Sequence, residues 1–398
     1  MVKKKRINYK RLAILLGCLA LCFYGGYTGV QKFLEPKPVE EPVKIAKSMS
    51  QDDIVDSIVQ KMTLEEKVGQ LFLVIPESVD DCGHDVVEPC IGFKDNQAKY
   101  NVGGIILFDN NLKDPEQTKK LIAKLQSWSK YPMFIAVDEE GGIVSRVGNT
   151  KAMQVPKIGD MNSIKDAQEA YDVGDTIGKY LHDLGFNLDF APVADVLINP
   201  NNIEIGGRSF GSDANKCGEF SSEVTKGLQK HNILATLKHF PGHGGYESNS
   251  HEGLSLSERS LDELRKTEFV AFKKAMTAEP ACIMVAHMSM PKLLGDSTPT
   301  TLSHKVVTGI LKKELGYNGL VVSDALNMGA IVKYYGTEEA AVKSLNAGVD
   351  ILLMPDKLES AYKAVIQGVK NGTVRQERLN EAVKKIVAAK LKYGIMSY

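Results

Sequence analysis

Residues 238–244, with the sequence Lys-His-Phe-Pro-Gly-His-Gly, gather side chains that can do chemistry. The run continues to His251, so three histidines and one lysine lie within fourteen residues, among glycines and a proline that bend the backbone. It follows the apolar run 233–237, which predicts the end of a buried strand opening into a loop. Such a density of titratable groups is typical of an active-site loop, and a solvated turn with incidental histidines is the alternative.

Titratable residues also stand at the ends of other predicted strands. Taken singly, each is explained by a structural cap or a buried ion pair, but parallel strands bring their carboxyl ends to one mouth, so together they predict a site. Carboxylates beside basic groups suit a hydroxyl-rich substrate and the cleavage of a glycosidic bond. Asp324 directly follows an apolar strand, a rigid placement that suits a nucleophile. The other strand-end residues are Asp138, Glu139, Asp189, Asp195 and His287.

Eight short apolar runs supply the strands that must position these residues. They span 71–75, 104–108, 133–137, 187–192, 235–240, 281–287, 319–323 and 350–354, and helical patterns span 115–129, 164–184, 214–231, 257–276, 305–315, 337–347, 357–368 and 376–393. Apolar strands that alternate with helices indicate a parallel sheet, and eight strands close into a barrel. An open doubly wound sheet is the alternative, but no Gly-x-Gly-x-x-Gly turn follows the first strand. We expect α/β architecture, with a single TIM-like (β/α)8 barrel over residues 50–398.

The first fifty residues differ from the rest of the chain. Residues 1–11 carry six lysines and arginines, and residues 12–30 carry no charge. A helix of that uncharged length measures about 28 Å, close to the thickness of a bilayer core. We therefore expect a cytoplasmic basic tip and signal-anchor helix over 1–30, a proline-rich and charged linker over 31–49, and a single-pass cell-membrane protein whose barrel is extracytoplasmic. A secreted protein with a cleaved signal peptide, or a lipoprotein modified at Cys18, is the alternative.

The net charge bears on whether nucleic acid is a partner, and the cysteines bear on disulfide or metal binding. The chain has 49 basic and 49 acidic residues, so its net charge of zero gives no reason to expect nucleic acid as a partner. Cys82 and Cys90 flank a short polar loop, and in an oxidising compartment we predict a disulfide between them. A metal site built from these cysteines and His84 lacks a fourth ligand. We expect a monomer without metal or organic cofactor.

Five segments resemble signatures of glycoside hydrolase family 3, in particular its β-N-acetylglucosaminidase branch. They are residues 135–142, 187–195, 207–213, 238–244 and 323–328, and the likeness runs in the family's order over about residues 50–398. The resemblance implies a retaining double displacement in which Asp324 is the nucleophile and His251 the general acid/base. It also implies that the terminal sugar is held by Asp138, Arg146, Arg208, Lys238 and His239. The structural alternatives are that Arg208 only clamps its loop and that Lys238 neutralises Asp189 or Asp195.

The segment before His251 departs from the family's pattern. The family has an aspartate two positions before this histidine, where the present chain has Asn249. A carboxylate fixes the tautomer of the ring and stabilises the imidazolium, whereas an amide supplies no charge. Glu247 and Glu252, on the same loop, are candidate substitutes. Without a substitute, His251 is a poor acid/base.

The resemblance implies an exo-acting β-N-acetylglucosaminidase that releases terminal N-acetylglucosamine from peptidoglycan fragments or related glycans through a covalent glycosyl-aspartate. One alternative is a membrane-tethered glycan-binding relative with weak or no turnover, which Asn249 favours. Another is a family-3 glycosidase or phosphorylase of other specificity. The histidine-bearing loop favours the amino-sugar branch over the glucosidases.

Overall fold

Eight parallel strands form the central sheet of the computed structural model, which describes residues 50–81, 83, 85–246 and 255–398. The strands are β1 (Phe72–Val74), β2 (Gly104–Ile106), β3 (Phe134–Val137), β6 (Leu188–Asp189), β7 (Leu234–Phe240), β9 (Cys282–Val285), β11 (Leu320–Ser323) and β12 (Leu352–Leu353). From β1 to β11 each strand pairs with the next in chain order, and β12 pairs with β1. A parallel bridge between Val322 and Ile351 joins β11 to β12 and closes the ring. The predicted TIM-like barrel is confirmed.

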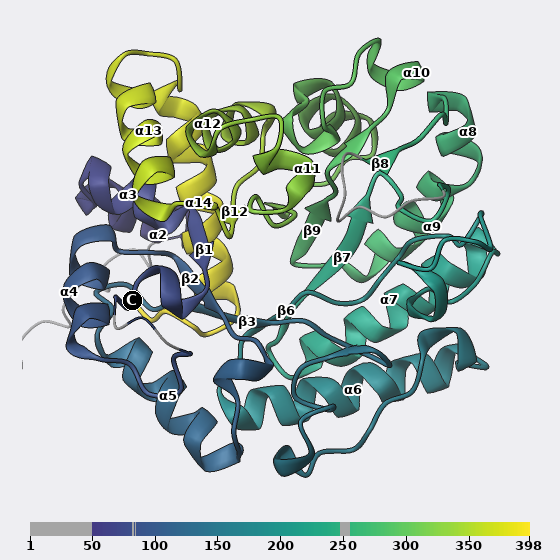
Figure 1. The fold of residues 1–398 in the computed structure, drawn as a ribbon, viewed down its shortest axis with the longest axis horizontal. Helices are drawn as coiled ribbons and strands as arrows, with labels where there is room; N and C mark the ends of the chain where they lie inside the picture. Colours follow the sequence, from purple (N-terminus) through teal and green to yellow (C-terminus); the bar gives the residue numbers. More distant parts are fainter. Residues whose placement is uncertain (1–49, 82, 84, 247–254) are drawn as a thin grey trace, which may run out of the picture. The chain divides into compact units, whose positions relative to one another are not determined.

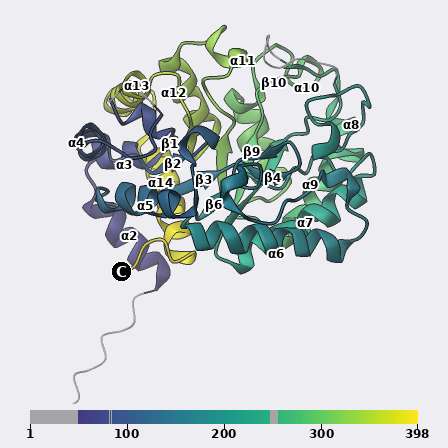
Figure 2. The same ribbon diagram turned by 60° about the horizontal axis from the view of Figure 1, so that its bottom comes forward.

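Helices cover the outside of the strands (Figures 1 and 2). After β1 to β6 come α4 (Ile91–Tyr100), α5 (Pro115–Ser127), α6 (Ala167–Leu184) and α7 (Ala214–Lys230). After β7 to β12 come α8 (Leu261–Lys266) with α9 (Glu268–Ala275), the π-helical η8 (Lys305–Glu314), α12 (Thr337–Ala347), and α13 (Leu358–Lys370) with α14 (Gln376–Lys392). The single helix expected over 257–276 is wrong, because the backbone at Thr267 (φ −130°, ψ −80°) leaves the helical region and separates α8 from α9.

Two helices precede the barrel, and the sequence patterns did not predict them. They are α2 (Gln51–Lys61) and α3 (Leu64–Gln70). Thr63 begins α3 with a capping box, in which its side chain accepts from the Glu66 amide and Glu66 accepts from the Thr63 amide. Both helices are short, and α2 buries only Val55 and Val59. An apolar stripe of that size carries little periodic signal.

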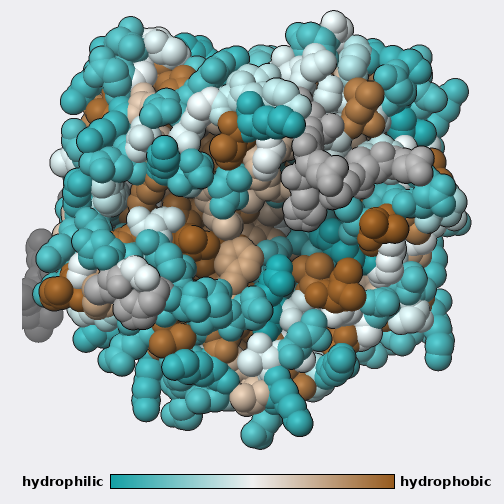
Figure 3. Space-filling model, viewed as in Figure 1, coloured by the Kyte–Doolittle hydropathy of each residue, from teal (hydrophilic) through white to brown (hydrophobic). Residues whose placement is uncertain are grey.

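Two small sheets extend the carboxyl ends of barrel strands. After β3, the strands β4 (Glu139–Gly141) and β5 (Val144–Ser145) form an antiparallel hairpin. Beyond β7, the strand β8 (Ser255–Leu256) pairs in parallel with β10 (Met288–Ser289), which follows β9. Figure 1 labels β8, and Figure 2 labels β4 and β10. On the face drawn in Figure 3, hydrophobic side chains are scattered among hydrophilic ones.

The predicted signal anchor and linker, residues 1–49, lie outside the described residues. Within the described part of the chain, no helix combines the length and apolar character that crossing a bilayer requires. The anchor therefore stays a prediction.

Candidate active site

Three consecutive carboxylates follow β3 and face different surroundings. Successive side chains of an extended chain point to opposite sides, which separates Glu139 from its two neighbours. Glu139 is fully buried and accepts hydrogen bonds from the backbone amides of Val147 and Gly148 (both 2.8 Å) and from the Tyr180 hydroxyl (2.7 Å). It holds the β4–β5 hairpin together. Asp138 and Glu140 are left to face the barrel mouth.

Lys238 stands between Asp138 and Glu140. Its Nζ lies 2.8 Å from Asp138 Oδ1 and 2.5 Å from Glu140 Oε1, and its side chain is 3% exposed. Arg208 binds both oxygens of Glu140, with Nε and Nη2 each at 2.8 Å. Burial by itself raises the pKa of Glu140, but Lys238 and Arg208 outweigh it and lower that pKa to about 2. Two cations and two anions thus form one compact network.

Arg208 belongs to the short helix η5 (Gly206–Arg208) and also donates to the Glu204 carbonyl oxygen at 2.9 Å. It clamps its own loop, as the structural alternative predicted, and at the same time reaches the Lys238 network. Lys238 has Asp138 and Glu140 within ion-pair distance, not Asp189 or Asp195 as the alternative proposed. Asp189 instead accepts from the Glu139 amide at 2.9 Å.

Asp195 organises the turn that follows β7. It is fully buried, and its two oxygens accept from the backbone amides of His239 (3.1 Å) and His243 (2.6 Å). His239 Nδ1 lies 2.6 Å from Asp195 Oδ2 and Nε2 lies 3.4 Å from Arg208 Nη2. Because a carboxylate only accepts, Nδ1 carries a proton and donates it to Asp195. The ring orientation of His239 is thereby fixed.

Asp324 begins the loop after β11. Its backbone amide donates to the Val285 carbonyl oxygen of β9, and its Oδ1 accepts from the Ala325 amide at 2.8 Å. Burial opposes ionisation, but the nearby His287 and His239, with the Ala325 amide, lower the pKa of Asp324 below its usual value. The carboxylate is half-buried and ionised at neutral pH, as nucleophilic attack requires.

Two further histidines border Asp324, and both are buried. His287 Nε2 lies 3.0 Å from the carbonyl oxygen of Ala325, and burial lowers the pKa of His287. Burial and the neighbouring His239 lower the pKa of His243 to about 4, and its ring contacts the Tyr246 hydroxyl. Both rings are therefore neutral near pH 7, so neither is a ready proton donor.

The structure brings most of the predicted site residues to one mouth. Asp138, Arg208, Lys238 and His239 form a connected set of contacts, and Asp324 lies close enough for its pKa to respond to His239. Arg146 shares this strand end: its backbone amide donates to the Asp138 carbonyl oxygen, and its guanidinium carbon lies 5.4 Å from the centre of the Phe108 ring. Its Nε is buried without a hydrogen-bond partner among the described residues.

The predicted acid/base residues and one cysteine of the predicted disulfide lie outside the described residues. Asn249, His251 and the candidate substitutes Glu247 and Glu252 lie outside the described residues, so the acid/base assignment stays a prediction. Cys82 also lies outside them, and the disulfide with Cys90 likewise stays a prediction.

Sequence reasoning missed Glu140 as a member of the site. It follows Asp138 by two positions in an extended segment, and residues so spaced share one face. That spacing was the available signal. His243 lies inside the segment that was singled out, yet no role was assigned to it.

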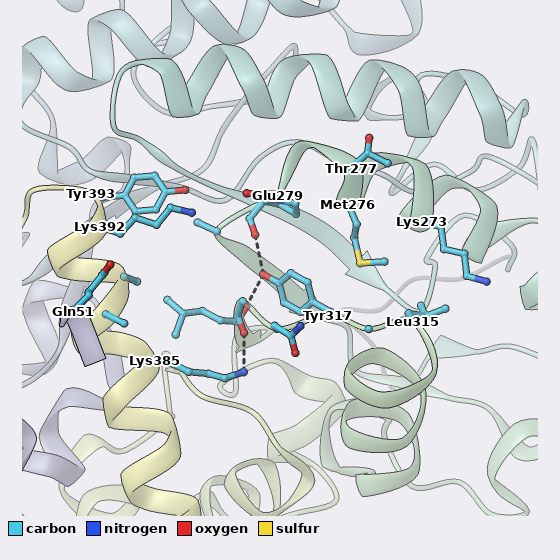
Figure 4. Close-up of a pocket in the computed structure, with 18 residues that line it drawn as sticks. Gln51, Lys273, Met276, Thr277, Glu279, Leu315, Tyr317, Lys385, Lys392 and Tyr393 are labelled. Atoms are coloured by element: carbon cyan, nitrogen blue, oxygen red, sulfur yellow. Dashed lines mark hydrogen bonds between the residues drawn. The ribbon is translucent and has the colours of Figure 1, made fainter. Parts of the chain in front are cut away.

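A cavity of about 730 Å³ lies apart from this site (Figure 4). Ala281 and Gly319, which precede β9 and β11, line it together with Lys385 and Tyr393 of the carboxyl-terminal helical segment. It therefore adjoins the amino ends of β9 and β11, whose carboxyl ends lead to His287 and Asp324. The candidate active site is at the other end of the barrel, as in barrels of this type.

Comparison with known proteins agrees with this geometry. The family model described as glycosyl hydrolase family 3 N terminal domain matches residues 63–389. Beta-hexosaminidase A of Pseudoalteromonas piscicida is 33% identical over 330 residues, 74% of this chain and 54% of the relative. Beta-hexosaminidase LpqI of Mycobacterium tuberculosis is 31% identical over 376 residues, 89% of this chain and 92% of the relative.

A solved structure shares the fold. The glycoside hydrolase family 3 beta-N-acetylglucosaminidase from Paenibacillus sp. superposes with a TM-score of 0.79 at 34% identity, covering 85% of this chain and 64% of that one. The present chain thus spans only part of some relatives and nearly all of LpqI. With a family model over most of its length, the chain belongs to glycosyl hydrolase family 3.

Proposed function

We propose that this glycoside hydrolase is an exo-acting β-N-acetylhexosaminidase that retains the configuration of the anomeric carbon. The observation that carries the proposal is Asp324, an ionised carboxylate on a rigid strand end beside donors and acceptors suited to a sugar. The beta-hexosaminidase names of the relatives support the amino-sugar specificity. The likeness to the Paenibacillus beta-N-acetylglucosaminidase supports N-acetylglucosamine as the released sugar.

The charge balance of the mouth suits a neutral sugar. Lys238 and Arg208 are matched by Asp138 and Glu140, so this four-residue network carries no net charge that would demand an ionic substrate. The partly exposed Asp138 can accept from a sugar hydroxyl, and the partly exposed Arg146 carries guanidinium donors for one. His239 presents its Nε2 at the same place.

Cleavage then takes two displacements at the anomeric carbon. In the first, an Asp324 oxygen forms a bond to that carbon as the glycosidic bond breaks, and the leaving oxygen receives a proton. In the second, water that loses a proton attacks the same carbon and releases Asp324. His243 and His287 are neutral and buried, which supports a donor outside the described residues, and we assign that role to His251.

Asn249 favours a second candidate, a membrane-tethered glycan-binding protein with weak turnover. It replaces the aspartate that the family's pattern places beside the acid/base histidine. The ionised Asp324 favours the enzyme, because a binding protein needs no nucleophile. We further propose peptidoglycan fragments as the glycan and an extracytoplasmic, membrane-anchored location, on the strength of the basic and uncharged segments of residues 1–30.

Nitrophenol release from nitrophenyl β-N-acetylglucosaminide by the full-length protein in detergent tests the proposal. We expect turnover that Asp324→Ala abolishes while its thermal unfolding midpoint stays within about 5 °C, since removing a partly exposed carboxylate has a small effect on stability. Trapping with a slow fluorosugar substrate should add one glycosyl mass to the peptide that contains Asp324. Sugar binding without turnover would favour the glycan-binding candidate, and residual activity in Asp324→Ala would overturn the nucleophile assignment.

A further inference from the structure

An ion pair outside the sugar-binding network lies against the turn after β7. Arg259 Nε is 2.6 Å from Glu268 Oε1, and Arg259 Nη2 donates to Glu268 Oε2 at 2.9 Å. Arg259 also donates to the Glu263 carbonyl oxygen and to the Thr267 hydroxyl, both at 3.1 Å. Glu268 is 1% exposed; burial raises its pKa, and the adjacent Arg259 opposes that rise. Removing two charged groups from water in this way costs desolvation free energy, so a buried ion pair adds little to stability by itself. The role of this pair therefore depends on what its geometry positions.

The pair touches the turn through two glycines. A methyl group on Gly242 would stand 2.4 Å from Glu268 Cγ, and one on Gly245 would stand 3.0 Å from Arg259 Cδ. Gly242 has φ +131°, a conformation that other residues rarely adopt. The turn backbone therefore rests directly on the Arg259–Glu268 pair, and His243 lies between the two points of contact.

The rest of α9 fixes the strand just before the turn. Phe240, the last residue of β7, stacks on Phe269 (ring centres 5.6 Å apart, 14° between planes) and meets Phe272 edge-on at 5.3 Å. Lys238 and His239, which precede Phe240, are thus also held by packing that does not involve the ion pair, while the Gly242 amide donates to the His239 carbonyl oxygen at 2.8 Å. A change confined to the pair should displace the turn and leave these two sugar-binding residues in place.

We propose that Arg259 and Glu268 are positioning residues. They fix where the turn at residues 241–246 lies, and with it the position of His243 relative to Asp324. The proposal rests on the proposed function for its kinetic consequence. The pair contacts Gly242 and Gly245 of the turn, and Asp195 accepts from the His243 amide at 2.6 Å. His243 borders Asp324, which carries the chemical step, whereas the side chains that bind the sugar come before the turn, so we expect the effect chiefly on kcat.

Glu268→Gln keeps the shape of the side chain and removes its charge. The matched control is Glu314→Gln, which breaks the exposed pair between Glu314 and Arg265 of α8 (2.8 Å) without touching the turn. We expect Glu268→Gln to lower kcat about 10- to 100-fold, as displacements of about 1 Å do, while KM for the nitrophenyl substrate changes less than about threefold. Glu314→Gln should stay within about twofold of the wild type, since exposed ion pairs contribute little.

A second readout does not depend on turnover. In protein labelled with 15N-histidine, the ring resonances of His243, assigned from a His243→Gln sample, should shift in Glu268→Gln and stay unchanged in Glu314→Gln. If the wild type shows no turnover, the proposed function fails, and this shift alone decides whether the pair positions the turn. Should Glu268→Gln not fold, Arg259→Lys, which keeps the charge and loses the two-pronged contact, takes its place with the same expected direction.

Two results would overturn the proposal. One is a folded Glu268→Gln whose kcat and His243 resonances match the wild type. The other is a loss of kcat accompanied by an equal loss of substrate binding and a lowered unfolding temperature, which would mean a general structural role.

Discussion

At the scale of single residues, three neighbouring carboxylates show how surroundings decide role. Asp138 is partly exposed and pairs with Lys238, whereas Glu140 is buried between Lys238 and Arg208. Glu139 is buried and accepts hydrogen bonds from backbone amides that follow the β4–β5 hairpin. The three are chemically alike and adjacent, so only the alternation of the chain and the location of the cations separate them. Glu140 therefore belongs to the candidate active site and also contributes to the stability of the fold.

Replacing Glu140 by glutamine should destabilise the protein. It leaves Lys238 and Arg208 buried with one carboxylate fewer, and breaking a buried pair from one side costs about 3 kcal/mol. Urea unfolding at pH 7 measures this loss of free energy. The matched control Glu359→Gln removes the exposed pairs with Lys99 and Lys363 and should cost less than about 1 kcal/mol.

The same variant gives a prediction about pH. The folded pKa of Glu140, about 2, lies below its ordinary value of 4.5, so the charged form contributes stability above pH 4.5 that is lost as pH falls toward 2. The difference in unfolding free energy between wild type and Glu140→Gln should therefore shrink across that window. A difference that stays constant from pH 5 to pH 2.5 in urea titrations would show that Glu140 carries no such shift.

Asn249 offers a residue-scale test of the acid/base. If the missing carboxylate limits proton transfer, Asn249→Asp should raise kcat for nitrophenyl β-N-acetylglucosaminide about tenfold or more, because general acid–base catalysis is worth about 10²–10⁴. Asn249→Ser serves as the control for loss of the amide alone. No change in kcat would indicate that Glu247 or Glu252 already supplies the charge.

At the scale of elements, close packing between α6 and α7 depends on glycine. A methyl group on Gly174 would stand 2.3 Å from the Val224 carbonyl oxygen, and one on Gly227 would stand 2.4 Å from the Asp175 amide nitrogen. The helices approach at these points because neither has a side chain there. They lie behind β3 and β6, so their spacing helps to set the strands that carry Asp138 and Asp189.

Gly174→Ala should lower the free energy of unfolding by about 1–3 kcal/mol, because overpacking exceeds the gain in helix propensity of about 1 kcal/mol. The matched control is Gly309→Ala in η8, where the nearest atom to a new methyl group is 3.8 Å away. That variant should be neutral or slightly stabilising. Thermal unfolding of both proteins tests the pair, and equal effects would contradict the close-packing argument.

At the scale of the whole molecule, α14 packs at the amino end of the barrel and places one lysine, Lys390, in the interior. Lys390 is fully buried, donates to Gln70 Oε1 at 2.7 Å, and lies 5.0 Å from the centre of the Phe134 ring. It forms no ion pair with any residue in the described part of the chain. Burial lowers the pKa of Lys390 to about 7. The positive charge of Lys390 is therefore unfavourable in the folded protein, and it lies at the end of the barrel opposite the candidate active site.

Lys390→Met should raise the free energy of unfolding at pH 7 by about 1–4 kcal/mol, as buried charges replaced by apolar side chains often do. Since the folded pKa lies below the unfolded value of 10.5, the unfolded wild type binds more protons between them, and its stability should rise from pH 7 to pH 10. That rise should be smaller in Lys390→Met. Lys392→Met, at an exposed position of the same helix, should show neither effect.

The order of strands and helices follows from the sequence, because apolar runs and helical periodicity are local properties of the chain. The sequence also places Asp324, Lys238 and His239 at strand ends, since the turn residues that follow each strand are local as well. Local patterns predicted short elements poorly, and α2 and α3 were missed. The helical pattern over 257–276 is unbroken in the sequence, so it did not predict the boundary between α8 and α9 at Thr267.

Which charges meet depends on the tertiary structure. Lys238 contacts Asp138, one hundred positions earlier, and Glu140, rather than Asp189 or Asp195. Arg208 completes this network through Glu140. The support of Gly242 and Gly245 by Arg259 and Glu268 likewise depends on how α9 packs against β7. Such partners follow from barrel closure and strand register, which bring distant strand ends within a few ångströms and leave no trace in local sequence patterns.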